Sequence, residues 1–363
     1  MTKKFILIGA KPQKEKAPNP GGQLTASIGI IDYLGSLGHE VEVIDTTQSS
    51  FPIPPIKERL FRGLSRVKQL FDLLRHQEVS GVIIFSSNGF SFYERIFQSL
   101  ICRLFRAPDI FFIRSGHFIN SLNRSIYKRF IARILLKIPK NIGAQGKNWV
   151  YFYEFLGVDK NKVHIVRNWL SPNFPITKKT KECKLGNIVS FIYVGWLTKE
   201  KGVPQLLDAV KKLKNKYKFE LHLVGGGTLE SFCHDFKNHD LDSILHIYGW
   251  QDKHDVIRML NRAHVFILPS EAEGFPNALL EAISLGFPAI CTDVGGVSDG
   301  LLDNHNGFLL ESNESSKIYD AMKKYLDSPA LINKHSESSM KIYHKYFDRE
   351  KNCKVLLNIF TEK

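Results

Sequence analysis

Short apolar runs of strand length alternate with helix-type segments along this chain, and the alternation occurs twice. In the first half the strand-type runs cover residues 5–10, 41–45, 81–86, 110–114, 141–144 and 163–166. In the second half they cover residues 191–195, 220–224, 245–248, 265–269 and 288–292. Such alternation is typical of parallel sheets joined by right-handed crossovers. The sequence therefore predicts an α/β protein with two doubly wound, Rossmann-like domains.

A polar segment separates the two halves. Residues 171–187 contain two prolines and a run of charges, a composition that is typical of a linker. At 363 residues, the chain is long enough for two cores of ordinary size. We therefore assign residues 1–170 to a first domain, 171–187 to the linker and 188–345 to a second domain. A doubly wound domain on each side of one linker predicts that the domains face each other across a cleft.

The cysteines and the apolar runs indicate the compartment. Five cysteines are scattered along the chain without a C-x-x-C pair, which fits a reducing environment and argues against a disulfide framework or structural zinc. The apolar run near the N-terminus is short and reads as a first strand, not as a signal peptide. No uninterrupted run reaches the ~18 apolar residues of a membrane span. We expect a cytoplasmic protein, soluble or peripheral to the membrane.

The positive charge of the chain is concentrated in its first half. The net charge is +14; residues 1–175 carry 25 Lys/Arg against 12 Asp/Glu, whereas residues 176–363 carry 25 against 24. Three basic segments there also place apolar residues on one helical face: Leu60, Leu64, Val67, Phe71 and Leu74; Ile96, Leu100 and Leu104; and Ile126, Phe130, Ile134 and Ile138. At least one of these helices should pack on the sheet, while one or two could lie against an anionic membrane surface. Nucleic acid is a less favoured partner, because no stacking platform or recognition motif accompanies the charge.

Two carboxylates eight positions apart, Glu273 and Glu281, form the most informative local pattern. Residues 265–269 before them read as a strand, and residues 278–285 read as a helix with Pro276 near its first turn. Glu273 should therefore lie in the loop that leaves a strand, and Glu281 in the helix that follows. Loops at the carboxyl ends of parallel strands bind phosphorylated ligands. Because two acids cannot hold a phosphate but can accept hydrogen bonds from hydroxyls, the combination indicates a nucleotide-sugar.

This motif and several others resemble those of the retaining glycosyltransferases of family 4, which belong to the group 1 glycosyl transferases and have the GT-B fold. The matching segments are residues 273–281, 286–288, 295–296 and 306–309, with 194–202, 223–227, 19–22 and 38–41 upstream. The similarity is dense over about residues 190–310. It implies that the first domain binds the acceptor and the second binds the nucleotide-sugar donor. It also implies that a final helix, about residues 346–363, packs back on the first domain.

The resemblance assigns roles in the donor domain. Glu281 would accept hydrogen bonds from the ribose hydroxyls, and Glu273 would bind hydroxyls of the transferred sugar. Lys201 would pair with the diphosphate, on which negative charge accumulates in the transition state. One loop would offer backbone amides to the sugar and diphosphate; it contains Gly274, Phe275, Pro276 and Asn277. Another loop, with Gly249 and Trp250, would hold the base. For the two carboxylates and the lysine, the alternative is an ordinary surface or capping residue.

In the first domain, the resemblance and the local pattern indicate an acceptor site. Gly21 and Gly22 open the first helix, where a backbone without Cβ atoms can approach a phosphate or the acceptor; the alternative is a plain turn. His117 matches the position of a family histidine near the reacting sugar, although a lone histidine is often structural. Arg114 is a candidate contact for an acceptor phosphate. Asn168 matches a family asparagine before the linker and reads as structural.

The family usually has an arginine where this chain has Trp196, which removes one of two cations expected at the diphosphate. Lys199 could compensate, as could backbone amides near Gly22 and Asn277. No D-x-D motif lies in a suitable loop and no His/Cys cluster has ligand spacing, so no essential metal or cofactor is expected.

The predicted function is retaining transfer of a sugar from a UDP- or GDP-sugar to a lipid-linked saccharide. His117, Glu273 and Lys201 would act at the reacting centre. The reaction would take place at the inner face of the cytoplasmic membrane, in the biosynthesis of a cell-surface polysaccharide or lipopolysaccharide. One alternative is a nucleotide-sugar enzyme without transfer, such as an epimerase. Another is a non-catalytic scaffold that binds sugar nucleotides, which the missing arginine at position 196 would favour.

Overall fold

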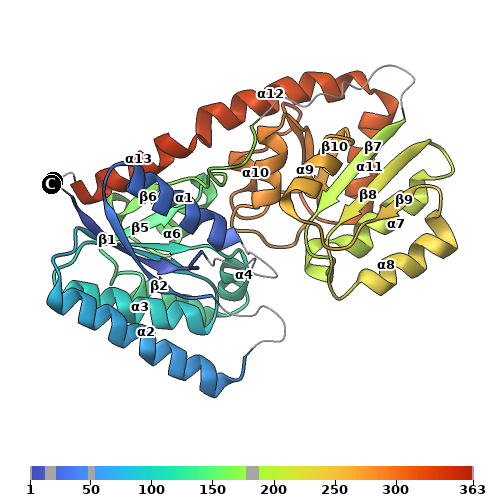
Figure 1. The fold of residues 1–363 in the computed structure, drawn as a ribbon. Helices are drawn as coiled ribbons and strands as arrows, with labels where there is room; N and C mark the ends of the chain where they lie inside the picture. Colours follow the sequence, from blue (N-terminus) through green and yellow to red (C-terminus); the bar gives the residue numbers. More distant parts are fainter. Residues whose placement is uncertain (1, 13–21, 48–53, 177–187, 362–363) are drawn as a thin grey trace. The chain divides into compact units, whose positions relative to one another are not determined.

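The computed structural model describes residues 2–12, 22–47, 54–176 and 188–361 (Figure 1). The chain divides into two compact units. Unit 1 contains Met1–Phe174 and Phe347–Lys363, and unit 2 contains Pro175–Tyr346. The unit boundary thus falls inside the predicted linker, of which residues 177–187 lie outside the described residues.

Unit 1 is built on a parallel sheet of six strands in the order β2-β1-β3-β4-β5-β6. The six predicted strands are confirmed, with ends that differ by one residue at most. The strands are β1 (Lys4–Gly9), β2 (Glu40–Asp45), β3 (Gly81–Ser86), β4 (Asp109–Ile113), β5 (Asn141–Ala144) and β6 (Val163–Ile165). Because winding reverses after β2, the topological switch point lies between β1 and β3.

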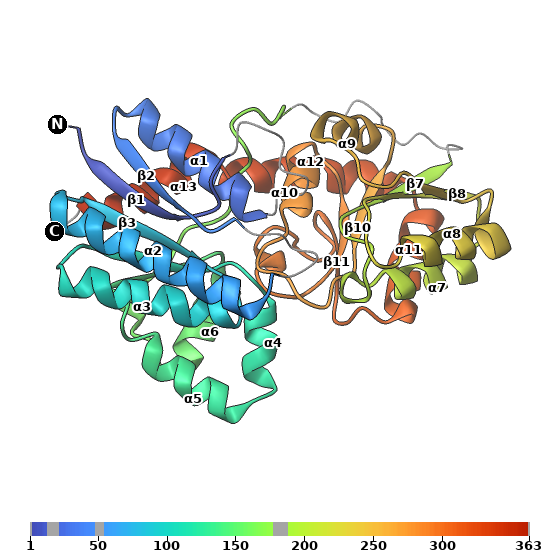
Figure 2. The same ribbon diagram turned by 60° about the horizontal axis from the view of Figure 1, so that its bottom comes forward.

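Helices cover both faces of this sheet (Figures 1 and 2). The helices are α1 (Gly22–Ser36), α2 (Ile56–His76), α3 (Phe90–Leu104), α4 (His117–Asn123), α5 (Ile126–Leu135), α6 (Lys147–Phe155) and α13 (Arg349–Thr361). Strand side chains alternate between the faces: Ile6 and Ile8 pack with α2, α3 and α6, whereas Phe5 and Leu7 pack with α1 and α13. The inner strands β1, β3 and β4 are buried on both faces and are nearly continuous apolar runs, as expected for a parallel sheet.

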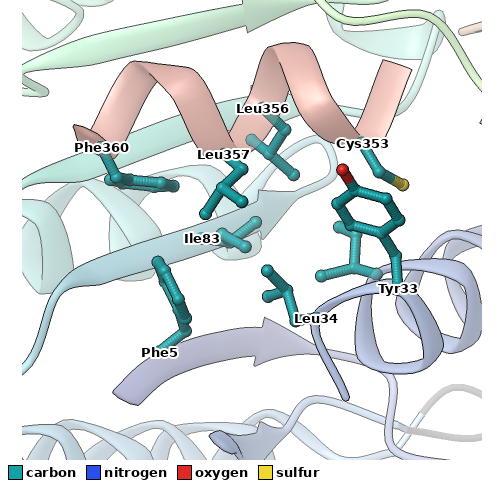
Figure 3. Close-up of a pocket in the computed structure, with 9 residues that line it drawn as sticks. Phe5, Tyr33, Leu34, Ile83, Cys353, Leu356, Leu357 and Phe360 are labelled. Carbon is teal, nitrogen blue, oxygen red and sulfur yellow. The ribbon is translucent and has the colours of Figure 1, made fainter. Parts of the chain in front are cut away.

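The last helix, α13, belongs to unit 1, although it follows the whole of unit 2 in the sequence. Its apolar side chains meet those of α1 and of the sheet in Figure 3. Phe360 lies over Gly81, where a Cβ would come within 2.5 Å of the phenylalanine ring. Arg349 forms an ion pair with Asp32 of α1. These contacts fix the end of the chain on the first unit.

Unit 2 has a second parallel sheet, in the order β12-β11-β10-β7-β8-β9. Its strands are β7 (Val189–Val194), β8 (Phe219–Val224), β9 (Leu245–Ile247), β10 (Val265–Leu268), β11 (Ala289–Thr292) and β12 (Gly307–Leu310). Its α-helices are α7 (Val203–Leu213), α8 (Glu230–Phe236), α9 (Lys253–Leu260), α10 (Asn277–Ser284), α11 (Ser315–Asp327) and α12 (Ala330–Tyr346). Because winding reverses after β9, the switch point lies between β7 and β10. The prediction of two doubly wound α/β sheets is confirmed.

One strand of unit 2 was not predicted. β12 is short and lies at the edge of the sheet, where it pairs only with β11. It begins at Gly307, which has a φ of 153° and where a Cβ would lie 2.0 Å from the Ala289 carbonyl oxygen. A four-residue run that begins with glycine has little strand propensity of its own, so pairing with β11 decides its conformation.

The three basic amphipathic segments form helices, but they bury their apolar faces to different degrees. In α3, Ile96 is buried in the core, so the expectation that at least one of them packs on the sheet is confirmed. In α5, the predicted apolar residues point to solvent instead: Ile126, Phe130 and Ile134 are 73%, 65% and 50% exposed. Figure 2 shows α5 at the periphery of unit 1, beside α4. None of the described helices is both long and apolar enough to span a bilayer.

The described cysteines are free and buried. Cys102, Cys233, Cys291 and Cys353 are free thiols in the interiors of the two units. Cys183 lies outside the described residues.

Candidate functional site

The carboxyl ends of β10, β7, β8 and β9 lie side by side in unit 2, because these strands are neighbours in a parallel sheet. The loops after β7 and β10 flank the switch point, where open α/β sheets bind ligands. Their backbones are joined, since the Glu271 amide donates to the Glu200 carbonyl at 2.8 Å. Gly202 has a φ of 72°, and a Cβ there would lie 2.0 Å from the Pro269 carbonyl oxygen. Glycine at this position allows the two loops to pack directly on each other.

This packing brings Lys201 and Glu273 into contact. The Nζ atom of Lys201 lies 2.5 Å from Oε1 of Glu273, and their side chains are 25% and 11% exposed. Their attraction is stronger than that of a fully hydrated pair because both groups are partly desolvated. Two predicted site residues that are 72 positions apart in the sequence are therefore neighbours in the structure. The pair places a cation for an anionic group beside a carboxylate that can accept a hydroxyl.

The loop that carries Glu273 is held from behind by two glycines. Gly295 has a φ of 59°, and a Cβ there would lie 1.9 Å from the Glu273 carbonyl oxygen. The amide of Gly296 donates to the Gly274 carbonyl at 2.7 Å. Gly274, Phe275 and Pro276 are buried, and α10 begins immediately after them at Asn277. The predicted diphosphate loop therefore has a fixed backbone and leads into a helix N-terminus, which favours anions.

Glu281 is the fifth residue of α10, and its carboxyl has an unusual proton affinity. Burial raises the pKa of Glu281 to about 7, although the positive charge of Lys253 opposes this shift. Burial in turn lowers the pKa of Lys253, and Glu281 partly restores it. Lys253, the first residue of α9, was not predicted as a site residue, because nothing in the linear sequence relates position 253 to position 281. A carboxyl poised near neutral pH can still accept hydroxyl hydrogen bonds once it is ionised.

The predicted base-binding loop lies beside an aromatic pair. The Gly225 amide donates to the Gly249 carbonyl at 2.8 Å, which links the loops after β8 and β9. The rings of Trp196 and Trp250 lie with centroids 5.2 Å apart, and Trp250 is 48% exposed. Tyr193 Oη donates to the Trp196 carbonyl at 2.6 Å. Where the family usually has an arginine, this chain therefore forms an aromatic contact with the predicted base loop.

The predicted residues of unit 1 gather at the carboxyl edge of its own sheet. Arg114 follows β4; its Nη2 donates to Asn168 Oδ1 at 3.0 Å and its guanidinium lies 4.8 Å from the centroid of the Phe85 ring. Burial lowers the pKa of Arg114 to about 10, and no described carboxylate compensates for this desolvation. His117 is the exposed first residue of α4, and its carbonyl accepts from Asn88 after β3. The edge thus presents a cation and an imidazole close together in the sequence.

The glycine pair of the first helix is only partly described. Gly22 is the exposed first residue of α1. Gly21 and the rest of the predicted segment 19–21 lie outside the described residues. Among the residues that the structure describes, no group of three or more His, Cys, Asp or Glu side chains could hold a metal ion.

Comparison with known proteins identifies a family whose model matches mainly the second unit, and several relatives. The family model described as "Glycosyl transferases group 1" matches residues 178–359. TuaC of Bacillus subtilis (strain 168), named for teichuronic acid biosynthesis, is 32% identical over 165 residues, which cover 46% of this chain and 40% of TuaC. The lipopolysaccharide 1,6-galactosyltransferase of Escherichia coli (strain K12) is 28% identical over 208 residues, or 53% of this chain and 55% of the relative. The matches thus span about half the length of these relatives.

Solved structures match over the whole chain. The lipopolysaccharide outer core galactosyltransferase WaaB, in its apo form, superposes with a TM-score of 0.73 at 17% identity, over 99% of both chains. HepE of Anabaena, in complex with UDP and glucose, superposes with a TM-score of 0.71 at 15% identity, over 100% of both chains. At such low identity these matches concern the fold, which is the two-sheet GT-B architecture.

Proposed function

Since the chain belongs to the glycosyl transferases group 1 family, we propose that it is a retaining glycosyltransferase. It moves a sugar from a UDP- or GDP-sugar to a lipid-linked saccharide, in the biosynthesis of a cell-surface polysaccharide or lipopolysaccharide. Unit 2 binds the donor and unit 1 binds the acceptor. The names of the relatives support this class of product, because they include lipopolysaccharide and capsular polysaccharide glycosyltransferases.

The observation that carries the proposal is the contact between Lys201 and Glu273 at the switch point, with Glu281 on the helix that follows. One cation and two carboxylates suit a ligand that has both a diphosphate and hydroxyls. Glu281 accepts the ribose hydroxyls, and Glu273 accepts hydroxyls of the transferred sugar. Lys201 sits where it can exchange part of its contact with Glu273 for the diphosphate. The exposed Trp250 offers a flat apolar surface to the base.

The proposed reaction needs no protein nucleophile. The bond between the anomeric carbon and the diphosphate oxygen breaks, and its electron pair goes to the diphosphate. The acceptor hydroxyl forms a new bond to that carbon on the same face, and its proton passes to the departing phosphate oxygen. Lys201 stabilises the charge that develops on the leaving group, an effect worth roughly 3–4 kcal/mol for one well-placed group. His117 is the candidate for a contact with the reacting sugar from unit 1.

An anionic, membrane-bound acceptor is supported by features of unit 1. Arg114 keeps a desolvated guanidinium at the carboxyl edge of the sheet without a described carboxylate partner, which favours an acceptor phosphate. The exposed apolar residues of α5 alternate with Lys128, Arg129 and Arg133. A helix with this pattern binds an anionic bilayer by burying apolar side chains and attracting lipid headgroups. We therefore propose that unit 1 attaches the protein to the inner face of the cytoplasmic membrane.

Donor binding and transfer can be tested separately. A thermal-shift screen against UDP, GDP, ADP, CMP and dTDP identifies the base, and the matching sugar nucleotides are then assayed for transfer and slow hydrolysis. Glu281→Ala should weaken nucleotide binding, whereas Glu273→Ala should chiefly lower turnover; Glu337→Gln, an exposed change on α12, serves as the control. Retention requires that the product has the same anomeric configuration as the donor, which NMR of the product determines.

Two outcomes would replace the proposal. Release of a free epimer or a sugar phosphate would indicate a nucleotide-sugar enzyme without transfer. Nucleotide binding with neither transfer nor hydrolysis for any donor would indicate a non-catalytic scaffold. The second outcome is considered because Trp196, which contacts Trp250, occupies the position where the family usually has a second cation for the diphosphate. Wild-type activity in both glutamate variants would show that the site is assigned wrongly.

A further inference from the structure

Unit 1 also has a concave basic pocket at the amino-terminal ends of its strands, whereas His117 lies at their carboxyl ends. The pocket has a volume of about 360 Å³ and lies where α3 ends and where β4, β5 and β6 begin. Its cationic lining residues are Arg103, Arg106, Lys140 and Lys162. Asp109 at the start of β4 lines it, whereas His117 follows the end of that strand. At about 3.3 Å per residue, one strand length of roughly 13 Å separates the two edges.

The described chain offsets only part of the positive charge of this pocket. None of its four cations forms an ion pair with a described carboxylate; Lys162 Nζ donates only to the carbonyls of Lys137 and Pro139, at 3.2 and 3.3 Å. The one acid, Asp109, is buried, and its carboxylate accepts from Ser99 Oγ and from the Lys140 amide. Four cations therefore face one carboxylate whose hydrogen bonds are already directed into the protein.

Arg106 has a backbone conformation that an arginine adopts at a cost. Its φ is 57°, in the left-handed region, and the Ala107 amide donates to the Cys102 carbonyl at 2.9 Å across it. This is the position after a helix at which glycine is strongly preferred, and a non-glycine residue there costs roughly 1 kcal/mol. An arginine that is strained in this way and lines a basic pocket indicates that its side chain is used.

We propose that this pocket binds a phosphate group. Arginine guanidinium groups match phosphate oxygens through paired, charge-assisted hydrogen bonds, and the lysines add positive charge around them. The phosphate can belong to a lipid headgroup or to a soluble phosphate ester. The neighbouring Leu104 is 73% exposed between Arg103 and Arg106, which suits a ligand with an apolar part. The site is separate from donor binding and sugar transfer, so it does not depend on the proposed function.

The variant Arg106→Gly tests phosphate binding without destabilising the fold. The variant removes one cation but relieves the strained backbone, so its melting temperature should equal or exceed that of the wild type. Its affinity for phosphate should fall about tenfold or more, the value of one charge-assisted contact. Arg103→Gln and Lys140→Gln should add to the loss. Asn304→Gly, with a φ of 53° in unit 2, controls for relief of strain, and Lys216→Gln controls for the loss of one positive charge.

Binding is measured with two probes on the intact protein. Calorimetric titration with sn-glycerol 3-phosphate measures binding of a soluble phosphate ester. Any binding of this probe at the donor site is the same in the wild type and the variants, so it cancels when their affinities are compared. Cosedimentation with vesicles of phosphatidylglycerol and phosphatidylcholine reports a lipid headgroup. If Arg106→Gly lowers the affinity for glycerol phosphate, the ligand is a soluble phosphate ester. If it lowers only the binding to vesicles, the ligand is a lipid headgroup. Equal binding by wild type and Arg106→Gly with both probes, or an equal loss in Lys216→Gln, would overturn the proposal.

Discussion

Glu281→Gln should stabilise the ligand-free protein at alkaline pH while it impairs nucleotide binding. Burial raises the pKa of the Glu281 carboxyl from 4.5 to about 7. The folded state therefore holds a proton more tightly than the unfolded state does. The stability that comes from this proton is fully present below pH 4.5 and is lost as the pH rises through 7. Glutamine is a neutral isostere that does not titrate, so the variant should escape this loss.

The size of the effect follows from the two pKa values. The difference between 4.5 and about 7, at about 1.4 kcal/mol per pKa unit, corresponds to about 3.5 kcal/mol in full. The Glu281 side chain keeps some contact with solvent, so we expect about 1.5–3 kcal/mol. The free energy of unfolding of the variant relative to the wild type should rise by this amount between pH 4.5 and pH 8.

Urea unfolding at several pH values, without nucleotide, measures this change. Tryptophan fluorescence follows both units, because Trp149 and Trp169 lie in unit 1 and Trp196 and Trp250 lie in unit 2. The slope with urea concentration checks that the transition stays comparable between the variants. The exposed Glu337→Gln serves as the matched control on α12. A difference between Glu281→Gln and wild type that does not vary with pH would refute the buried, proton-binding carboxyl at this position.

Three further predictions concern the donor loop, the nucleotide and the membrane. If ionised Glu281 accepts the ribose hydroxyls, nucleotide affinity should rise about tenfold between pH 6 and pH 8, and calorimetry with Glu281→Gln should show no such rise. Gly295→Ala should displace the loop that carries Glu273, lowering turnover at least tenfold and stability by about 1–2 kcal/mol. Gly35→Ala is the control in both assays, since a Cβ there meets nothing within 4 Å. Reversal of the charges of Arg129, Arg133 and Lys137, on α5 and just after it, should weaken cosedimentation with anionic vesicles by more than 100-fold, at about 1 kcal/mol per charge. The control reverses three lysines of unit 2, Lys216, Lys341 and Lys345, and should leave cosedimentation unchanged.

The sequence by itself predicted the architecture, because strand-length apolar runs that alternate with helix-type segments are typical of parallel sheets joined by crossovers. It also determined that Glu273 leaves a strand and that Glu281 lies in the following helix, since Pro276 fixes where that helix starts. Both inferences rest on short-range pattern. The amphipathic pattern of α5 was visible too, but not the direction of its apolar face, which the structure turns to solvent.

Only the tertiary structure decided which groups meet. The contact of Lys201 with Glu273 depends on β7 and β10 being neighbours at the switch point, although 72 positions separate the two residues. The field of Lys253 at Glu281 and the ring contact of Trp196 with Trp250 likewise join separate loops. Proton affinity and ion pairing depend on desolvation and on distance through space. The linear sequence gives neither the desolvation of a group nor its distance from other groups. The environment of Glu273 and Glu281 therefore follows only from the sheet, which places their loops beside those of Lys201 and Lys253.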